Sequence, residues 1–145
     1  MPTVTDVLRQ KDRRVVYVDI SDMVLKAVKT MNHNRVGAVV VLDNGELAGI
    51  FTERDVLTKI VAAEISPQDM SVAAVMTAPV ICCSMSTDID DVAHIMQTQR
   101  IRHLPVRDDE HQIVGMISIG DINAFNVAQK QATIENMADY IYGRS

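Results

Sequence analysis

Two pairs of hydroxyl and aspartate residues, each spaced three positions apart, directly follow short apolar runs. The first pair is Thr52 and Asp55, and the second is Ser118 and Asp121. At a helix start, the hydroxyl accepts a hydrogen bond from an early backbone N–H, and the acid can bond back to the cap. The same position carries free N–H groups and the positive end of the helix dipole, which can hold a phosphate or a ribose edge. The spacing therefore predicts either a structural helix cap or a ligand-binding turn, and it leaves both open.

The two pairs lie inside a longer repeat. Gly49 to Val56 and Gly115 to Ile122 share one order of residue types: a glycine, two apolar residues, the hydroxyl residue and the aspartate three places later. Upstream, an apolar stripe at helical spacing occurs twice, 65 positions apart: Val24, Ala27, Val28 and Met31, then Ile89, Val92, Ala93 and Met96. A stripe and a motif that recur in register predict a chain built from two similar halves.

Each half is predicted to run helix, strand, helix, strand, strand, helix. In the first half the strands fall at 15–18, 37–42 and 47–51, and the Asn44-Gly45 dipeptide is typical of a tight hairpin between the last two. The continuous hydrophobicity of 37–42 indicates a strand that is buried on both faces. The second half repeats this order, beginning with a strand over 79–83.

The first motif starts a helix over 54–63, and Pro67 follows it in a segment that links the halves, since proline cannot continue a helix interior. We therefore divide the chain into 1–66 and 67–145. The second motif helix is longer and continues to Tyr142 with a broad apolar side. Either a dimer contact or packing along its own module would cover that side.

The composition limits the class of protein. The chain has 145 residues, of which 48% are apolar and 23% charged, and its net charge is −5. Such a chain folds, and its charge argues against a general electrostatic grip on nucleic acid or anionic lipid. It has no apolar run near the ~18 residues of a membrane span and no signal-peptide pattern, which predicts a cytoplasmic protein. We interpret the neighbouring Cys82 and Cys83 as small strand residues rather than a disulfide, a redox pair or metal ligands.

The chain resembles a tandem pair of cystathionine β-synthase (CBS) domains, or Bateman module, of the stand-alone bacterial type. The matching segments are 35–41, 43–45 and 49–55 in the first half, and 76–80, 102–106 and 115–121 in the second. The resemblance covers nearly the whole chain. It implies an α/β (α+β) fold of two CBS domains, 1–66 and 67–145, each a mostly antiparallel three-stranded sheet packed with two helices, related by pseudo-twofold symmetry.

The resemblance also implies two clefts for an adenosine-containing ligand, first AMP, ADP or ATP, with NAD or S-adenosylmethionine as further candidates. Asp55 and Asp121 would accept hydrogen bonds from the ribose diol, because a carboxylate offers two acceptor oxygens. Thr52 and Ser118 would contact ribose or phosphate. The adenine edge would meet the backbone of one strand in each cleft: Pro79, Val80 and Ile81 in one, and Val15 and Val16 in the other.

The implied phosphate contacts are Arg54, Arg100, Arg102 and His103, with Arg35 and Lys11 ranked behind them. Where the first motif has Arg54, the second has Gly120, which loses a cation and gains close backbone approach. The first cleft is thus expected to be better equipped for phosphate, and the second to borrow its cations. Readings without a ligand stay open: both motifs as plain caps, Arg100 and Arg102 as a solvated face, and His103 as a core-edge histidine.

These features predict a non-enzymatic, cytoplasmic sensor that binds a nucleotide, forms a homodimer and signals through shape or association. The protein target is unknown. The sequence contains no nucleophile paired with a base, no metal-ligand set and no Gly-rich phosphate loop. Two other hypotheses are an interaction subunit with vestigial clefts, and an enzyme that uses Glu53 or His103.

Overall fold

The computed structural model describes residues 1–11 and 15–141. The first half contains α1 (Val4–Arg9), β1 (Tyr17–Asp19), α2 (Val24–Asn34), β2 (Ala38–Asp43), β3 (Glu46–Thr52), α3 (Glu53–Asp55) and the π-helix η1 (Val56–Val61). The second half contains the 3-10 turn η2 (Pro67–Asp69), α4 (Val72–Val75), β4 (Cys83–Ser84), α5 (Ile89–Gln99), β5 (His103–Arg107), β6 (Ile113–Ser118) and α6 (Ile119–Ile141). This order confirms the predicted repeat.

The structure has two three-stranded sheets, ordered β1-β2-β3 and β4-β5-β6. In each sheet the first pair of strands is parallel, because a helix connects them, and the second pair is an antiparallel hairpin. The first hairpin turns at Asn44 and Gly45, which both have positive φ, as the tight turn predicted from the sequence requires. Ala38 to Val41 of β2 are buried, which confirms a strand covered on both faces. The fold class is therefore as expected.

The short helices are exchanged between the halves. Val4 and Val7 of α1 pack into the core of the second sheet, whereas Val72 of α4 packs into the core of the first. Backbone hydrogen bonds hold both helices there: the Val4 N–H donates to the Thr87 carbonyl at 2.9 Å, and the Val72 N–H donates to the Asp22 carbonyl at 2.9 Å. The boundary predicted near residue 66 thus separates the two repeats in the sequence, but each core includes a short helix from the other side of that boundary.

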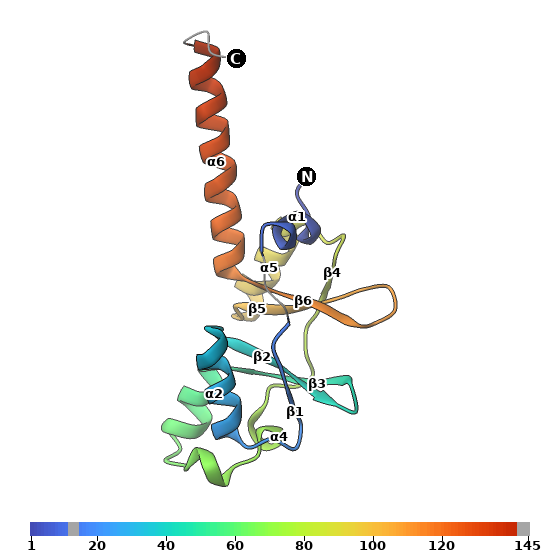
Figure 1. Cartoon of the computed structure of the whole chain (residues 1–145), viewed down its shortest axis with the longest axis vertical. Helices are drawn as coiled ribbons and strands as arrows, with labels where there is room; N and C mark the ends of the chain where they lie inside the picture. Colours follow the sequence, from blue (N-terminus) through green and yellow to red (C-terminus); the bar gives the residue numbers. More distant parts are fainter. Residues whose placement is uncertain (12–14, 142–145) are drawn as a thin grey trace.

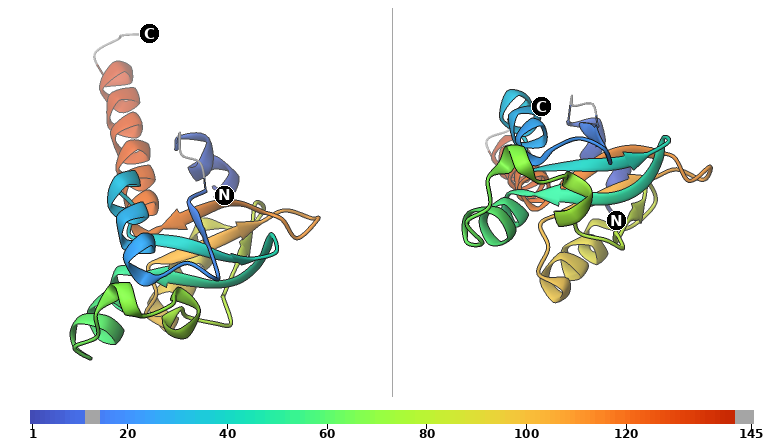
Figure 2. Two further views of the ribbon diagram at one scale, coloured as in Figure 1. Left: turned by 60° about the horizontal axis from the view of Figure 1, so that its bottom comes forward. Right: turned by 90° about the horizontal axis from the view of Figure 1, so that it is seen from below.

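The two sheets lie one above the other, and their hairpin turns point to the same side of the molecule (Figures 1 and 2). The connector after α4 passes from one layer to the other (Figure 1). This arrangement brings the start of one sheet next to the motif of the other, which is what positions the candidate site.

The long helix α6 projects away from the rest of the chain (Figure 1). Its buried side chains, Ile122 and Phe125, lie near its start. Further along, the side chains of Val127, Ile134 and Met137 are 62%, 66% and 59% exposed. The tail therefore does not pack along its own module, and a dimer contact stays a prediction; Tyr142 lies outside the described residues.

Three elements differ in detail from the prediction. The helix expected over 54–63 is one α-turn, α3, followed by the wider π-helix η1. The strand expected over 79–83 forms only from Cys83, since Pro79 has no backbone N–H to share with a neighbouring strand. Val16 precedes β1, although its carbonyl accepts a hydrogen bond from the Val40 N–H at 3.0 Å.

Candidate functional site

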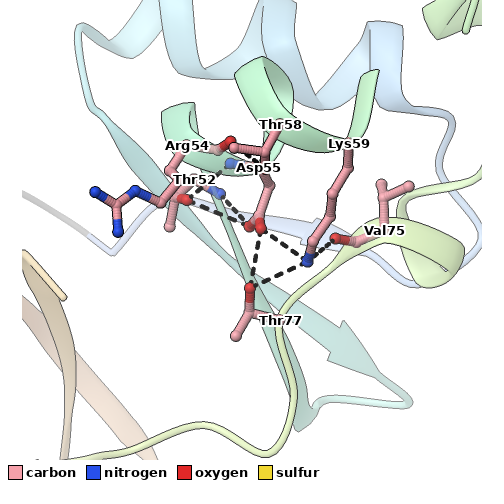
Figure 3. A network of polar contacts seen from close by, with 7 residues as sticks. All are labelled: Thr52, Arg54, Asp55, Thr58, Lys59, Val75 and Thr77. Atoms are coloured by element: carbon pink, nitrogen blue, oxygen red, sulfur yellow. Dashed lines mark hydrogen bonds and ion pairs between the residues drawn. The ribbon is translucent and has the colours of Figure 1, made fainter. Parts of the chain in front are cut away.

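The aspartate of the first motif lies at the centre of a network of protein groups (Figure 3). Its Oδ2 accepts hydrogen bonds from the Thr52 N–H at 3.0 Å and the Thr52 hydroxyl at 3.3 Å. Its Oδ1 accepts one from the Thr77 hydroxyl at 3.0 Å and pairs with Lys59 Nζ at 2.9 Å. Asp55 is 3% exposed. Both of its oxygens therefore already have partners within the chain.

This network gives the first motif a structural role. The Thr52 hydroxyl also accepts from the Asp55 N–H at 3.3 Å, which completes a capping box. Lys59 donates in addition to the Val75 carbonyl at 2.9 Å, so the network ties η1 to the connector after α4. The predicted ribose contact of Asp55 stays a prediction, and it requires that Thr77 and Lys59 give up the carboxylate.

The aspartate of the second motif has a different set of partners. Oδ2 of Asp121 accepts from the Ser118 N–H at 2.9 Å and pairs with Lys11 Nζ at 2.7 Å, while the Ser118 hydroxyl accepts from the Asp121 N–H at 3.0 Å. Oδ1 accepts no hydrogen bond from the described residues. Burial raises the pKa of Asp121, but the bonds from Lys11 and Ser118 outweigh it, so the pKa lies below its usual value. This carboxylate is ionised and retains one acceptor oxygen.

A cleft of about 260 Å³ opens in front of the second motif. Residues of both halves line it: Leu8, Lys11, Val16, Arg35, Val36, Gly37, Ala38, Met85, His103, Val114, Gly115, Met116 and Ser118. Asp121 is not among them, but its carboxylate contacts two residues that are, Lys11 and Ser118. The cleft thus combines a hydroxyl, two cations and apolar walls.

His103 faces this cleft from the start of β5. Burial lowers the pKa of His103; the negative charges of Glu53 and Asp121 raise it, and Lys11 and Arg102 lower it. At neutral pH the ring is therefore mainly neutral. It can donate one hydrogen bond to a phosphate, and a phosphate would favour its protonation.

The other predicted cations divide between two places. Arg35 and Lys11, ranked last from the sequence, line the cleft at the second motif. Arg54 Nη1 instead donates to the Arg100 carbonyl at 3.3 Å, which joins the first motif to the end of α5. Arg100 and Arg102 are exposed. Two cations of the first half, Lys11 and Arg35, thus line the cleft at the second motif, and the phosphate contacts expected for each cleft stay predictions.

The predicted adenine-contacting segments take matching positions in the two halves. Val16 lines the cleft at the second motif, and Val15 precedes it. In the other half, Thr77 pairs with Ile50 of β3 and bonds to Asp55 of the first motif. Pro79, Val80 and Ile81 follow Thr77 in the chain and precede β4. Gly120 is exposed, and an added Cβ would meet only the Ser118 hydroxyl at 3.6 Å.

Two partners of the motif aspartates were not singled out from the sequence, Lys59 and Thr77. Thr77 comes from a position that local sequence patterns do not connect with the aspartate. Lys11, which follows α1, and Thr77, which follows α4, each reach the aspartate of the other half, and they differ in charge.

Cys83 is a buried residue of strand β4, in agreement with its interpretation as a small strand residue, whereas Cys82 precedes the strand and is half-buried. Burial raises the pKa of Cys83 to about 11, and burial also raises that of Cys82, so both are thiols at neutral pH. Both are free. Within residues 1–11 and 15–141, no cluster of His, Cys, Asp or Glu side chains is suited to a metal ion.

A larger hollow, of about 480 Å³, lies between the two hairpin turns and includes Tyr17, Glu46, Arg107 and His111. Nε of Arg107 is buried there without a hydrogen-bond partner among the described residues. The hollow contains acidic and basic groups in similar number. Its lining therefore does not favour one charge of ligand.

Two similar α/β units that face each other through their sheets and line one cleft together define a paired ligand-binding module. The chain belongs to the CBS domain family: the family model, described as CBS domain, matches residues 4–62 and 72–126. This membership confirms the resemblance inferred from the motifs.

The chain is similar to the mitochondrial CBS domain-containing protein CBSX3 of Arabidopsis thaliana, with 35% identity over 97% of this chain and 72% of the relative. It spans 23% or less of three further Arabidopsis relatives. A putative signal-transduction protein with CBS domains from Burkholderia ambifaria has the same fold, with a TM-score of 0.84, 37% identity, and coverage of 88% of this chain and 95% of that one.

Two more distant structures contain ligands. The CBS domain protein PAE2072 of Pyrobaculum aerophilum is complexed with AMP; it has a TM-score of 0.73 and 21% identity, with 83% of this chain and 89% of that one covered. The CBS domain pair of MJ0100 is in complex with 5′-methylthioadenosine and S-adenosyl-L-methionine; its TM-score is 0.77 and its identity 23%, over 89% of this chain and 98% of that one. At this identity the likeness concerns the fold.

Proposed function

We propose that this chain is a regulatory module that binds an adenosine-containing ligand in the cleft at the second motif, with AMP, ADP or ATP as the first candidates. The observation that carries the proposal is the cleft itself. It presents the Ser118 hydroxyl, the Lys11 and Arg35 cations and apolar residues of both halves, directly in front of an ionised carboxylate. AMP, 5′-methylthioadenosine and S-adenosyl-L-methionine in two proteins of the same fold support the ligand class.

The cleft suits such a ligand in size and chemistry. Its volume of about 260 Å³ is close to the lower end of the ~300–1,000 Å³ typical of small-molecule sites. Asp121 offers acceptor oxygens to a ribose diol, Val16 and Val36 offer apolar contact to the base, and Arg35 offers charge to a phosphate. NAD and S-adenosylmethionine share the adenosine group and remain candidates.

The module regulates without catalysis in this proposal and acts as a homodimer. Ligand binding between the two halves would change how the sheets meet, and the exposed face of α6 would join two copies. We propose a cytoplasmic location, whereas the relative CBSX3 is described as mitochondrial. No helix in the described part of the chain is long and apolar enough to cross a membrane.

Thermal unfolding with a panel of adenosine compounds tests the proposal. A ligand that binds only the folded chain raises its stability by about 2.7 kcal/mol at a hundredfold excess over Kd, which is a clear rise in Tm. We expect a rise with at least one compound in the wild type and none with the Asp121→Asn variant. Equal Tm values with and without every compound would favour an interaction subunit with vestigial clefts. Turnover of a bound nucleotide would favour an enzyme.

A further inference from the structure

The structure assigns a selective role to Lys11, and this inference rests on the proposed function. We propose that Lys11 makes the cleft at the second motif specific for phosphorylated adenosine ligands, because its ammonium occupies Oδ2 of Asp121 and must be displaced before a ribose diol can bond to both carboxylate oxygens. A phosphate gives the displaced ammonium a new partner. A neutral nucleoside does not.

Lys11 holds the carboxylate closely. Its Nζ lies 2.7 Å from Oδ2 of Asp121 and also donates to the Met116 carbonyl on β6. The side chains of Lys11 and Asp121 are 15% and 18% exposed. In such a largely desolvated pair, removing one partner leaves the other charge without compensation, which is unfavourable. Separation of the two charges therefore requires a replacement for each.

This arrangement differs from that of the first motif. There, the side chain that reaches the aspartate from the other half is Thr77, a neutral hydroxyl that bonds to Asp55. The cation of Asp55 is Lys59, four positions further along its own helical segment. The residue equivalent to Lys59 in the second half is Phe125, which is buried in the core. Asp121 therefore pairs with a cation from the N-terminal segment of the chain.

The position of Lys11 allows exchange of its partner. Its side chain lines the cleft and also pairs with Asp121, so the ammonium lies between the carboxylate it contacts and the space that a ligand would fill. Arg35 and His103 line the same cleft. With a neutral ligand, the displaced ammonium would lie near the positive Arg35 without a counter-charge, while a phosphate would compensate it. The ribose then binds the freed carboxylate.

The test compares the binding of adenosine and AMP by titration calorimetry in the full chain. We expect the wild type to bind AMP at least tenfold more tightly than adenosine. In Lys11→Met, AMP should bind about tenfold or more weakly, and adenosine should bind as well as or better than in the wild type, because Asp121 is no longer occupied. Lys11→Arg should retain most of the preference for AMP. Lys26→Met, which removes an exposed ion pair with Asp22 on α2, is the matched control and should change neither affinity.

The outcomes separate the two proposals. If both compounds bind the wild type and Lys11→Met changes their affinities by the same factor, the role of Lys11 is wrong and the proposed function stands. If neither adenosine nor AMP binds the wild type, the role of Lys11 is wrong, and the panel of adenosine compounds decides the proposed function. The double variant Lys11→Met/Asp121→Asn removes both charges. A higher Tm in the double variant than in Lys11→Met would show that the unpaired Asp121 charge, and not the lost side chain of Lys11, destabilises the single variant.

Discussion

Asp55 and Asp121 occupy equivalent positions of the repeat, and each bonds back to the hydroxyl residue that precedes it. Their remaining oxygens differ. Asp55 is fully bonded to Thr77 and Lys59, whereas Asp121 shares one oxygen with Lys11 and keeps the other. A carboxylate with four protein donors stabilises the fold, and one with an open acceptor and a movable cation can bind a ligand. The same motif therefore serves two purposes in one chain.

Replacement of Asp55 is expected to lower the stability of the fold, with a smaller effect on ligand binding. Asp55→Ala removes the buried carboxylate that accepts from Thr52, Thr77 and Lys59, and hydrogen bonds to a charged group contribute about 1.5–3 kcal/mol. Chemical denaturation should show a fall of this size in the free energy of unfolding. The control is Lys26→Ala, whose exposed ion pair contributes about 1 kcal/mol or less. Equal effects of the two variants would contradict the structural role of Asp55.

His103 should make the stability of the protein depend on pH. Burial holds the pKa of His103 below its ordinary value of 6.5 in the folded chain. Between the two pKa values the unfolded chain binds more protons, so the free energy of unfolding rises with pH in this range and falls as pH drops below 6.5. Denaturation curves between pH 7.5 and about 5 should show this fall, and His103→Gln should reduce it. An identical pH dependence in the variant would show that other groups cause it.

At the scale of elements, the motif glycines allow a connector to lie against each hairpin. A Cβ added at Gly49 would come 2.5 Å from Sδ of Met76 and 3.1 Å from the Thr77 carbonyl, and one at Gly115 would come 2.9 Å from Cδ1 of Leu8. These contacts place Thr77 and Lys11 beside their aspartates. The glycine of the repeat is therefore a packing requirement of the exchanged connectors as well as part of a turn signature.

Gly49→Ala should accordingly destabilise the protein by about 1–3 kcal/mol, the usual cost of overpacking. Gly120→Ala is the matched control, since its Cβ would meet only an ordinary contact at 3.6 Å and alanine is the better helix former. Its Tm should be unchanged or higher. A larger loss of stability in Gly120→Ala than in Gly49→Ala would contradict the packing described for the connectors.

The elements also show what the sequence could and could not predict. The repeat, the hairpin at Asn44-Gly45 and the buried strand β2 follow from local periodicity and turn chemistry, and all three are confirmed. The exchange of α1 and α4 could not be predicted in this way, because a short apolar helix fits the core of either half equally well. The cations of the motif aspartates could not be predicted in this way either. Arg54 is next to Asp55 in the sequence, but the cation that pairs with Asp121 is Lys11, from the other half of the chain.

At the scale of the molecule, α6 provides an apolar face that the rest of the chain leaves exposed. Val127, Ile134 and Ile141 recur every seven residues, and Met137 lies between the last two; all four are more than half exposed. This spacing is typical of the seam between two paired helices. A second copy of the chain is the partner that best explains it within the proposed function.

The variant Ile134→Glu should therefore shift the protein from dimer toward monomer, because it places a charge in the centre of the seam. Light scattering after size-exclusion chromatography should give twice the chain mass of 16.0 kDa for the wild type and a value close to 16.0 kDa for the variant. Gln129→Glu lies on the other side of α6 and should remain a dimer. A monomeric wild type, or a dimeric Ile134→Glu, would show that α6 does not join two copies.

The central claim is that an adenosine ligand binds between the two halves at the second motif. A nuclear magnetic resonance titration of the isotope-labelled chain with AMP tests it most directly. The largest shifts are predicted for the backbone amides of Val16, Gly37 and Ser118, which line the cleft from both halves, and they should disappear in Asp121→Asn. Shifts confined to other surfaces, or the same shifts in Asp121→Asn, would contradict it.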